Sequence, residues 1–120
     1  MRARRATFPK SARLLRSPEF RRVQGGGRRI RTRHMLVLWA RGRGAESRFG
    51  LVVSRKVGNA VTRNRVKRWL REAIRHNRWR LEGQRLDLAV IASPRAADAG
   101  LDALERDLLF ALSKLPGGAR

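Results

Sequence analysis

The sequence predicts one mixed α/β domain whose elements follow the order helix, strand, strand, helix, strand, helix. Three observations lead to this prediction. The chain has 120 residues, which suits a single domain with one core. Apolar residues make up 42% of it, enough to form that core. Glycine and proline residues divide the chain into segments whose apolar residues follow either helical spacing or the short runs typical of strands.

The first segment, residues 10–24, is predicted to form a short helix or helical turn. Its candidate apolar contacts are Leu14, Leu15, Phe20 and Val23. Pro18 suits a first helical turn, because the N–H that proline lacks would be unpaired there in any case. We expect residues 1–9 to form a basic N-terminal arm, 10–115 to form the fold and 116–120 to be a tail.

Two strands are predicted next, over residues 31–40 and 48–57. The first is rich in Val, Leu and Trp, which favour strands. In the second, period-two spacing places four apolar side chains on one face: Phe49, Leu51, Val53 and Val57. Residues 42–47 between the strands are predicted to form a hairpin loop.

The strongest helical pattern covers residues 62–78, with Thr62 as the predicted N-cap. Its apolar residues recur at spacings of three and four: Val66, Trp69, Leu70, Ala73 and Ile74. The nearly apolar run 86–92 predicts a strand that is covered on both faces. A last helix is predicted over residues 100–114, with a buried side made of leucines: Leu101, Leu104, Leu108, Leu112 and Leu115.

The charge of the chain is strongly positive and unevenly distributed. Lys and Arg number 30 against 9 Asp and Glu, a net charge of +21. Residues 1–80 hold 25 of the basic and three of the acidic side chains, whereas residues 81–120 hold five and six. A folded domain with such a surplus indicates a polyanionic partner, above all nucleic acid. We therefore expect the first two-thirds to build the binding surface and the last third to be structural.

Several classes of protein are excluded by what the sequence lacks. There is no Cys, which rules out disulfide scaffolds, thiolate zinc fingers and thiol nucleophiles. The first 20 residues contain six basic side chains and no apolar run of signal-peptide length. No segment approaches the ~20 apolar residues that span a bilayer. We expect a soluble, intracellular protein with no membrane partner.

Cationic side chains, with one amide, cover the part of segment 62–78 that the apolar stripe leaves free. They are Arg63, Asn64, Arg65, Lys67, Arg68, Arg71 and Arg75, with Glu72 as the sole acid. Like charges four residues apart repel, and a helix face chosen only for solubility normally mixes both signs. The scarcity of acids therefore favours phosphate binding. Arg55 and Lys56 add two cations just before this helix, whose N-terminus can itself receive a phosphate.

The aromatic residues divide between core and surface. Phe49 and Trp69 follow apolar spacings and are predicted to be core residues. Trp39 and Phe20 fit either location. Phe8, between polar residues and Pro9, is expected on the surface or in a cleft, where a ring can stack on a nucleic-acid base.

Groups for catalysis or metal binding are sparse. His34 and His76 are the only histidines, and they are far apart in the sequence. Only Glu19, Glu46 and Glu72 precede residue 81 among the acids. A two-metal nuclease would need converging carboxylates. We therefore predict no catalytic residue and no metal ligand in this chain, and expect any reaction it serves to draw its catalytic groups from elsewhere.

One run of the sequence resembles a known family. Residues 49–68 read FGLVVSRKVGNAVTRNRVKR, with an Arg-Asn-Arg triplet inside the basic helix. This run is similar to the signature of the bacterial ribonuclease P protein component. Residues 8–10, 13–14 and 18–20 also resemble that family, and the resemblance extends over about residues 8–115.

The resemblance implies a fold and a function. The fold is a two-layer α/β sandwich with a small sheet and a left-handed β-α-β crossover through the basic helix, against the usual right-handed rule. The function is that of the non-catalytic protein subunit of an endoribonuclease, a monomer in a cytoplasmic ribonucleoprotein. In the family this subunit binds ribonuclease P RNA and the 5′ leader of precursor tRNA, while the RNA, with Mg²⁺, is the catalyst that yields mature tRNA 5′ ends.

The resemblance also assigns roles to individual positions. The RNA-binding residues would be Arg55, Lys56, Arg63, Asn64, Arg65, Lys67, Arg68 and Arg71. The cleft for the leader would include Phe8, Arg13 and Phe20. Two departures bear on leader affinity or preference. Gln24 stands where many relatives have a second aromatic, and Ser93 and Pro94 stand where a basic pair often follows the last strand.

Three other functions stay open from the residues. A ribosomal protein would share this composition, but it would bind ribosomal RNA and sediment with ribosomal subunits. A double-stranded DNA binder would place helix 62–78 in a major groove and would need a short helix directly before it, where strands are predicted instead. A stand-alone protein nuclease would cleave precursor tRNA with no RNA partner.

Overall fold

A four-stranded sheet with helices on both faces forms the framework of the protein. The computed structural model describes residues 8–13 and 17–116. The strands are β1 (Arg28–Arg31), β2 (Met35–Arg41), β3 (Arg48–Val52) and β4 (Leu86–Ala92). The helices are α1 (Ser17–Gly26), α2 (Ala60–Asn77) and α3 (Leu101–Ser113), and shorter 3-10 helices are η1 (Lys10–Ala12), η2 (Arg78–Leu81) and η3 (Pro94–Asp98).

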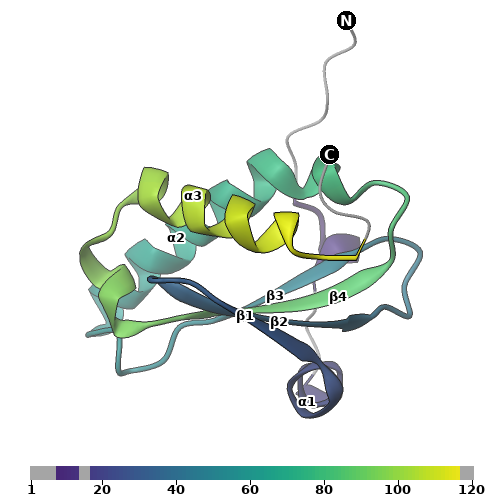
Figure 1. Ribbon diagram of the computed structural model, residues 1–120. Coiled ribbons are helices and arrows are strands. Elements are labelled where there is room, and N and C mark those ends of the chain that lie inside the picture. The colour runs from purple at the N-terminus through teal and green to yellow at the C-terminus, as the bar shows by residue number, and fades with distance from the viewer. Residues whose placement is uncertain (1–7, 14–16, 117–120) are drawn as a thin grey trace, which may run out of the picture.

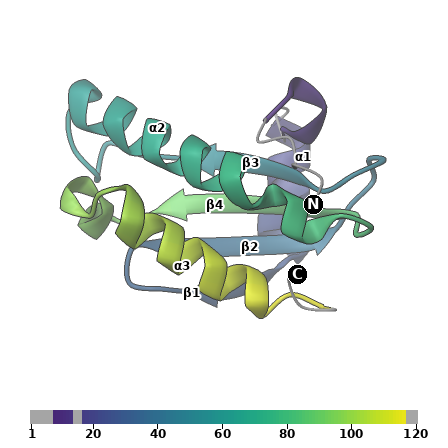
Figure 2. The same cartoon turned by 90° about the horizontal axis from the view of Figure 1, so that it is seen from above.

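The helices are divided unequally between the two faces of the sheet. Helices α2 and α3 lie side by side over one face, and α1 crosses the opposite face (Figures 1 and 2). The mixed α/β prediction is confirmed. The sheet and the α2–α3 pair form two layers around the main core, which contains Phe49, Leu70, Leu88 and Leu108. A much smaller cluster lies under α1, where the fully buried apolar residues are Val23, Leu38 and Ala89.

Strand β4 occupies an inner position of the sheet, in the order β1-β2-β4-β3. It pairs antiparallel with β2 and parallel with β3. The predicted hairpin over residues 42–47 is therefore wrong, because the strands that this loop connects are not neighbours. Strand β4 is almost entirely buried, and the inner position covers both its edges and both its faces.

The N-terminal half of the sheet contains one strand more than predicted. The strand expected over residues 31–40 is β2, which begins only at Met35, and the additional strand β1 precedes it and pairs with it antiparallel. They meet at a turn where the N–H of Thr32 donates to the carbonyl oxygen of Met35 at 2.9 Å. Strand β1 reads Arg-Arg-Ile-Arg and is mostly exposed, so it carries almost no apolar pattern from which it could be predicted.

The connection from β3 through α2 to β4 joins two parallel neighbours. Figure 2 views the sheet from the side of α2 and α3. If that view is turned so that both strands point upward, β4 lies to the left of β3 and α2 lies in front. This crossover is left-handed, contrary to the general rule for such units.

Helix α2 begins two residues earlier than predicted, and its N-cap is Asn59 rather than Thr62. The Thr62 N–H donates to Oδ1 of Asn59 at 2.9 Å, so Thr62 is inside the first turn. The predicted apolar stripe is confirmed, with its members fully buried except for a half-buried Trp69. Strand β4 has the predicted bounds, and α3 lies within the predicted range.

The segment predicted as one helix over residues 10–24 contains η1 and α1. Pro18 lies in the first turn of α1, as predicted, and Val23 is fully buried. The predicted contacts of Leu14 and Leu15 lie outside the described residues. Strand β3 ends at Val52, five residues before its predicted end, and the chain turns at residues 55–57. Val57 is nevertheless buried in the main core.

Candidate nucleic-acid interface

Helix α2 carries a group of cations that have no carboxylate partner within the described residues. No hydrogen bond or ion pair between these residues engages the side chains of Arg63, Lys67, Arg68 and Arg71. Arg68, Arg71 and the neighbouring Asn64 are exposed, whereas Lys67 and Arg63 are half-buried and Nε of Arg63 is buried without a hydrogen-bond partner. We call these five residues the basic face of α2. Unpaired cations spaced along one helix face can each meet a backbone phosphate.

The C-terminal end of α2 is electrostatically different. Arg75 is held by Glu72, with Nε to Oε1 at 3.1 Å and Nη2 to Oε2 at 2.7 Å. The guanidinium lowers the pKa of Glu72, mainly through the hydrogen bond, and Glu72 raises the pKa of Arg75 in return. His76 lies between Glu72 and Glu105, with ring nitrogens 3.6 and 3.7 Å from their carboxylate oxygens. Carboxylates thus mark the C-terminal limit of the basic face.

Arg65 points back toward the fold, although it belongs to the predicted RNA-binding triplet. Its Nη2 donates to the carbonyl oxygen of Ala97 at 3.3 Å. Its guanidinium carbon lies 5.4 Å from the centre of the Trp69 ring, within range of a cation–π contact. Arg65 therefore holds η3 against α2.

Arg55 and Lys56 are exposed in the turn between β3 and α2. The turn is closed by hydrogen bonds from the N–H of Val57 to the Ser54 oxygen at 3.0 Å and from the N–H of Gly58 to the Arg55 oxygen at 3.2 Å. Gly58 has a φ of +155°, and a Cβ atom there would lie 2.9 Å from Cγ2 of Thr62. This turn therefore places two cations next to the N-terminus of α2, where the helix dipole favours anions.

The three residues predicted to form the leader cleft lie on two faces of the sheet. Phe8 packs edge-on against Phe49, with ring centres 6.3 Å apart, and so belongs to the α2 side. Arg13 lies over the Phe8 ring at 5.0 Å, and its Nε donates to the Phe8 carbonyl at 3.1 Å. Phe20 is on the α1 side, half-buried against Gly50 of β3. The structure thus brings Phe8 and Arg13 together and keeps Phe20 apart from them.

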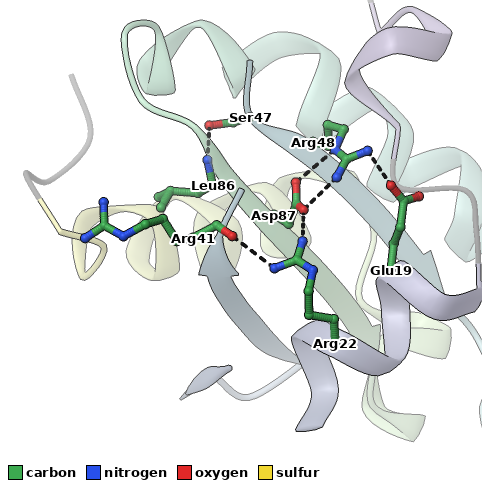
Figure 3. A network of polar contacts seen from close by, with 7 residues as sticks. All are labelled: Glu19, Arg22, Arg41, Ser47, Arg48, Leu86 and Asp87. Carbon is green, nitrogen blue, oxygen red and sulfur yellow. Dashed lines mark hydrogen bonds and ion pairs between the residues drawn. The ribbon is translucent and has the colours of Figure 1, made fainter. Parts of the chain in front are cut away.

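A network of two arginines and two carboxylates joins α1 to the sheet (Figure 3). Asp87 of β4, fully buried, accepts from Arg48 Nε at 2.9 Å and from Arg48 Nη2 at 2.7 Å. It also pairs with Arg22 of α1, and Arg48 Nη1 reaches Glu19 of α1 at 2.5 Å. Asp87 is the main cause that raises the pKa of Arg48, ahead of Glu19, while burial acts in the opposite direction.

Beside this network lies a hollow of about 380 Å³, lined by Pro18, Glu19, Arg22, Arg43 and Arg48. This site was not predicted from the sequence, where its one signal is Asp87, the single charged residue in an otherwise apolar strand. A buried carboxylate requires cationic partners, but the sequence does not tell which of the many arginines supply them.

The part of the chain that the structure describes contains neither a cluster of metal ligands nor a helix that could span a membrane. No group of three or more His, Cys, Asp or Glu residues there is placed to hold a metal ion. None of its helices has the length and apolar character needed to cross a membrane. Nδ1 of His34 lies 2.8 Å from Oδ2 of Asp107, which ties the β1–β2 turn to α3.

Comparisons with known proteins agree with this arrangement. The profile of the ribonuclease P family matches residues 8–116. The ribonuclease P protein component of Geotalea uraniireducens is 39% identical over 108 residues, which cover 90% of this chain and 94% of the relative. That of Geobacter sp. (strain M21) is 49% identical over 73 residues, a stretch that covers 61% of this chain and 63% of the relative.

The solved structures lead to the same family. The ribonuclease P protein from Thermotoga maritima superimposes with a TM-score of 0.78 at 28% identity, over 87% of this chain and all of the other. The residues that the family profile matches include the sheet, the three helices and the basic face of α2. This chain belongs to the ribonuclease P protein family.

Proposed function

We propose that this chain is the protein subunit of a ribonuclease P ribonucleoprotein. In this proposal it binds ribonuclease P RNA and the 5′ leader of precursor tRNA, and thereby assists the RNA-catalysed removal of the leader. The observation that carries the proposal is the basic face of α2, where four cations lack a carboxylate partner within the described residues. Membership of the ribonuclease P protein family suggests which polyanions this surface binds, namely ribonuclease P RNA and precursor tRNA.

The proposed contribution of the protein is binding rather than bond cleavage. Each cation that meets a phosphate releases condensed counterions, so affinity should fall with salt by a log-log slope of about −0.7 to −0.9 per contact. The Mg²⁺ ions of the reaction belong to the RNA in this proposal. We expect one protein copy for each catalytic RNA, in the cytoplasm.

Two surfaces are available for the two RNA molecules. The basic face of α2, with Arg55 and Lys56 at its N-terminal end, offers phosphate contacts on one side of the sheet. Phe20 on α1 offers a half-exposed ring on the other side, suited to stacking on a base of a single strand. We assign Phe20 to the leader. Phe8 is better placed for packing against Phe49 than for a shared cleft with Phe20.

The test is reconstitution of the holoenzyme. The purified protein, its cognate ribonuclease P RNA and a precursor tRNA with a leader are assayed at low Mg²⁺. We expect leader removal to require the RNA and to be accelerated by the protein. Cleavage by the protein alone would identify a stand-alone nuclease, and indifference of the RNA to the protein would overturn the proposal.

A pair of variants tests the surface itself. Arg68→Ala combined with Arg71→Ala should weaken binding to ribonuclease P RNA and make its salt dependence shallower by about 1.4 to 1.8 log units per log unit of salt. Arg106→Ala combined with Lys114→Ala removes two exposed cations from α3 and its C-terminal end, and is the matched control. Equal effects of the two changes would show that only the net charge matters and would remove the basic face from the site.

A further inference from the structure

The network around Asp87 joins two carboxylates to two arginines, and the proposed function does not yet use it. Asp87 is fully buried, and two arginines from different elements converge on it. Arg48 comes from β3 and Arg22 from α1 (Figure 3). Arg22 also donates from Nη1 to the carbonyl oxygen of Arg41 in β2, at 3.0 Å. One helix is thereby tied to three strands.

Helix α1 rests on a small apolar cluster. Its buried members are Val23, Leu38 and Ala89, and the partly buried residues packed against them are Phe20, Leu36, Ala40 and Ile91. Apolar contacts tolerate sliding and rotation, whereas hydrogen bonds between charged groups need particular distances and angles. Buried ion pairs are better attested as determinants of register than of stability. The polar network is therefore suited to set the position of α1 on the sheet.

We propose that Asp87 is a positioning residue for the leader-binding surface: through Arg22 and Arg48 it fixes α1, and with it Phe20, against the sheet. The inference rests on the proposed function, because it assigns Phe20 to the leader. Glu19 completes the arrangement from the N-terminal turn of α1, since it pairs with the same Arg48 that holds Asp87. The two carboxylates and the two arginines neutralise one another. In this proposal Arg22 therefore holds α1 against the sheet and does not contact a phosphate.

The first experiment measures the position of α1 without RNA. Because the chain has no native Cys, two cysteines can be added for spin labels, at Gly25 on α1 and Ser113 on α3. Both positions are exposed, and a Cβ atom at Gly25 meets nothing within 4 Å. Pulsed electron spin resonance then gives the distribution of distances between the labels.

The variants for this experiment are placed on α1, because replacing the buried Asp87 endangers the fold itself. Arg22→Ala and Glu19→Gln should each broaden or shift the distance distribution. Arg21→Ala is the matched control, because Arg21 is the exposed neighbour of Arg22 and its side chain makes no polar contact within the described structure. It should leave the distribution unchanged. Distributions for Arg22→Ala and Glu19→Gln that match the unsubstituted chain would overturn the inference.

The second experiment measures binding of precursor tRNA by the reconstituted holoenzyme. For Arg22→Ala we expect affinity for a leader-bearing precursor to fall roughly fivefold, while affinity for tRNA without a leader stays the same. The salt slope should not change, because Arg22 releases no counterions. Arg22→Lys should restore part of the loss, since one ammonium can still reach Asp87. A slope shallower by about 0.7 would show instead that Arg22 meets a phosphate.

The two experiments separate failure of this inference from failure of the proposed function. If α1 shifts in Arg22→Ala but binding of every RNA is unaffected, Asp87 positions a helix that the leader does not use, and the inference is wrong. If the unsubstituted protein fails to bind the leader at all, the proposed function fails, whatever the spin labels report. Thermal unfolding of each variant checks that it is folded at the assay temperature.

Discussion

The ring of Phe20 lies directly on the backbone of Gly50, so that a Cβ atom at residue 50 would be 2.3 Å from Cζ of that ring. No side chain larger than hydrogen fits there unless Phe20 moves. Gly50→Ala should therefore displace Phe20 and lower the free energy of unfolding by about 1–3 kcal/mol, as overpacking does. Urea unfolding measures the stability, and binding of leader-bearing precursor should weaken in parallel.

Gly25→Ala is the matched control for this prediction. A methyl group at Gly25 meets open space within α1. Alanine in a helix is more favourable than glycine by about 0.5–1 kcal/mol, so this variant should be more stable than the unsubstituted chain. Unchanged stability and leader binding in Gly50→Ala would show that Phe20 is free to move away at no cost.

The cap of α2 gives a second prediction. Asn59→Ala removes the acceptor of the Thr62 N–H and should lower the free energy of unfolding by about 1 kcal/mol. Asn59→Asp keeps an acceptor oxygen at this position and should retain most of the stability. Chemical denaturation of both variants provides the measurement. Equal losses in the two variants would mean that the amide of Asn59 has a role other than capping.

Arg65 and Arg68 should respond in opposite ways to removal. Arg65→Ala loses the hydrogen bond to Ala97 and the contact with Trp69, so it should cost about 1 kcal/mol of stability. Arg68→Ala should leave the melting temperature unchanged but make the salt dependence of RNA binding shallower by about 0.7 to 0.9. The assignment fails if Arg65→Ala keeps full stability while its salt slope changes like that of Arg68→Ala.

The ion pair of Glu72 and Arg75 is predicted to stabilise the fold in a pH-dependent way and to weaken RNA binding. The pKa of Glu72 is lowered from 4.5 in the folded protein. Its contribution to stability is therefore present above the unfolded value and is lost as the pH falls through the folded value. Glu72→Gln should melt at a lower temperature than the unsubstituted chain at neutral pH, and the difference should vanish well below pH 4.5.

The same variant should bind RNA more tightly at neutral pH, because it removes the carboxylate charge that pairs with Arg75 beside the basic face of α2. Asp98→Asn, an exposed change of equal charge in η3, is the control. Melting curves and titrations with ribonuclease P RNA at pH 7 test both parts. A tighter complex in Asp98→Asn as well would attribute the gain to net charge alone.

The sequence predicted those elements whose apolar pattern is dense. Helix α2, strand β4 and helix α3 were all found because each buries a continuous stripe or run. Strand β1 was missed, since three of its four residues are exposed arginines that pair through the backbone. The hairpin was wrong for a related reason: a loop between two strands does not reveal that a later strand will insert between them.

The sequence predicted which residues belong to the candidate site, but not how their side chains lie in space. The charge pattern of segment 62–78 located the cations of α2 and the family resemblance assigned them to RNA, and the structure leaves four of them without a carboxylate partner in its described part. That Arg65 donates to the carbonyl oxygen of Ala97 depends on where η3 passes, which no local pattern contains. Likewise, Phe8 and Phe20 both fall in the basic N-terminal region, yet they lie on opposite faces of the sheet. Phe8 packs against Phe49 and Phe20 against Gly50, and successive residues of a strand face opposite sides of the sheet.

The inner position of β4 constrains the order in which this protein can form during synthesis. Strands β2 and β3 both pair with β4, which is the last strand to leave the ribosome. Until β4 has been synthesised, through residue 92, β3 has no neighbour within the sheet. More than two-thirds of the chain is by then outside the folded state, with a large positive charge and an exposed apolar surface. A nascent fragment that ends before β4 should therefore stay unfolded and prone to capture by ribosomal RNA or chaperones.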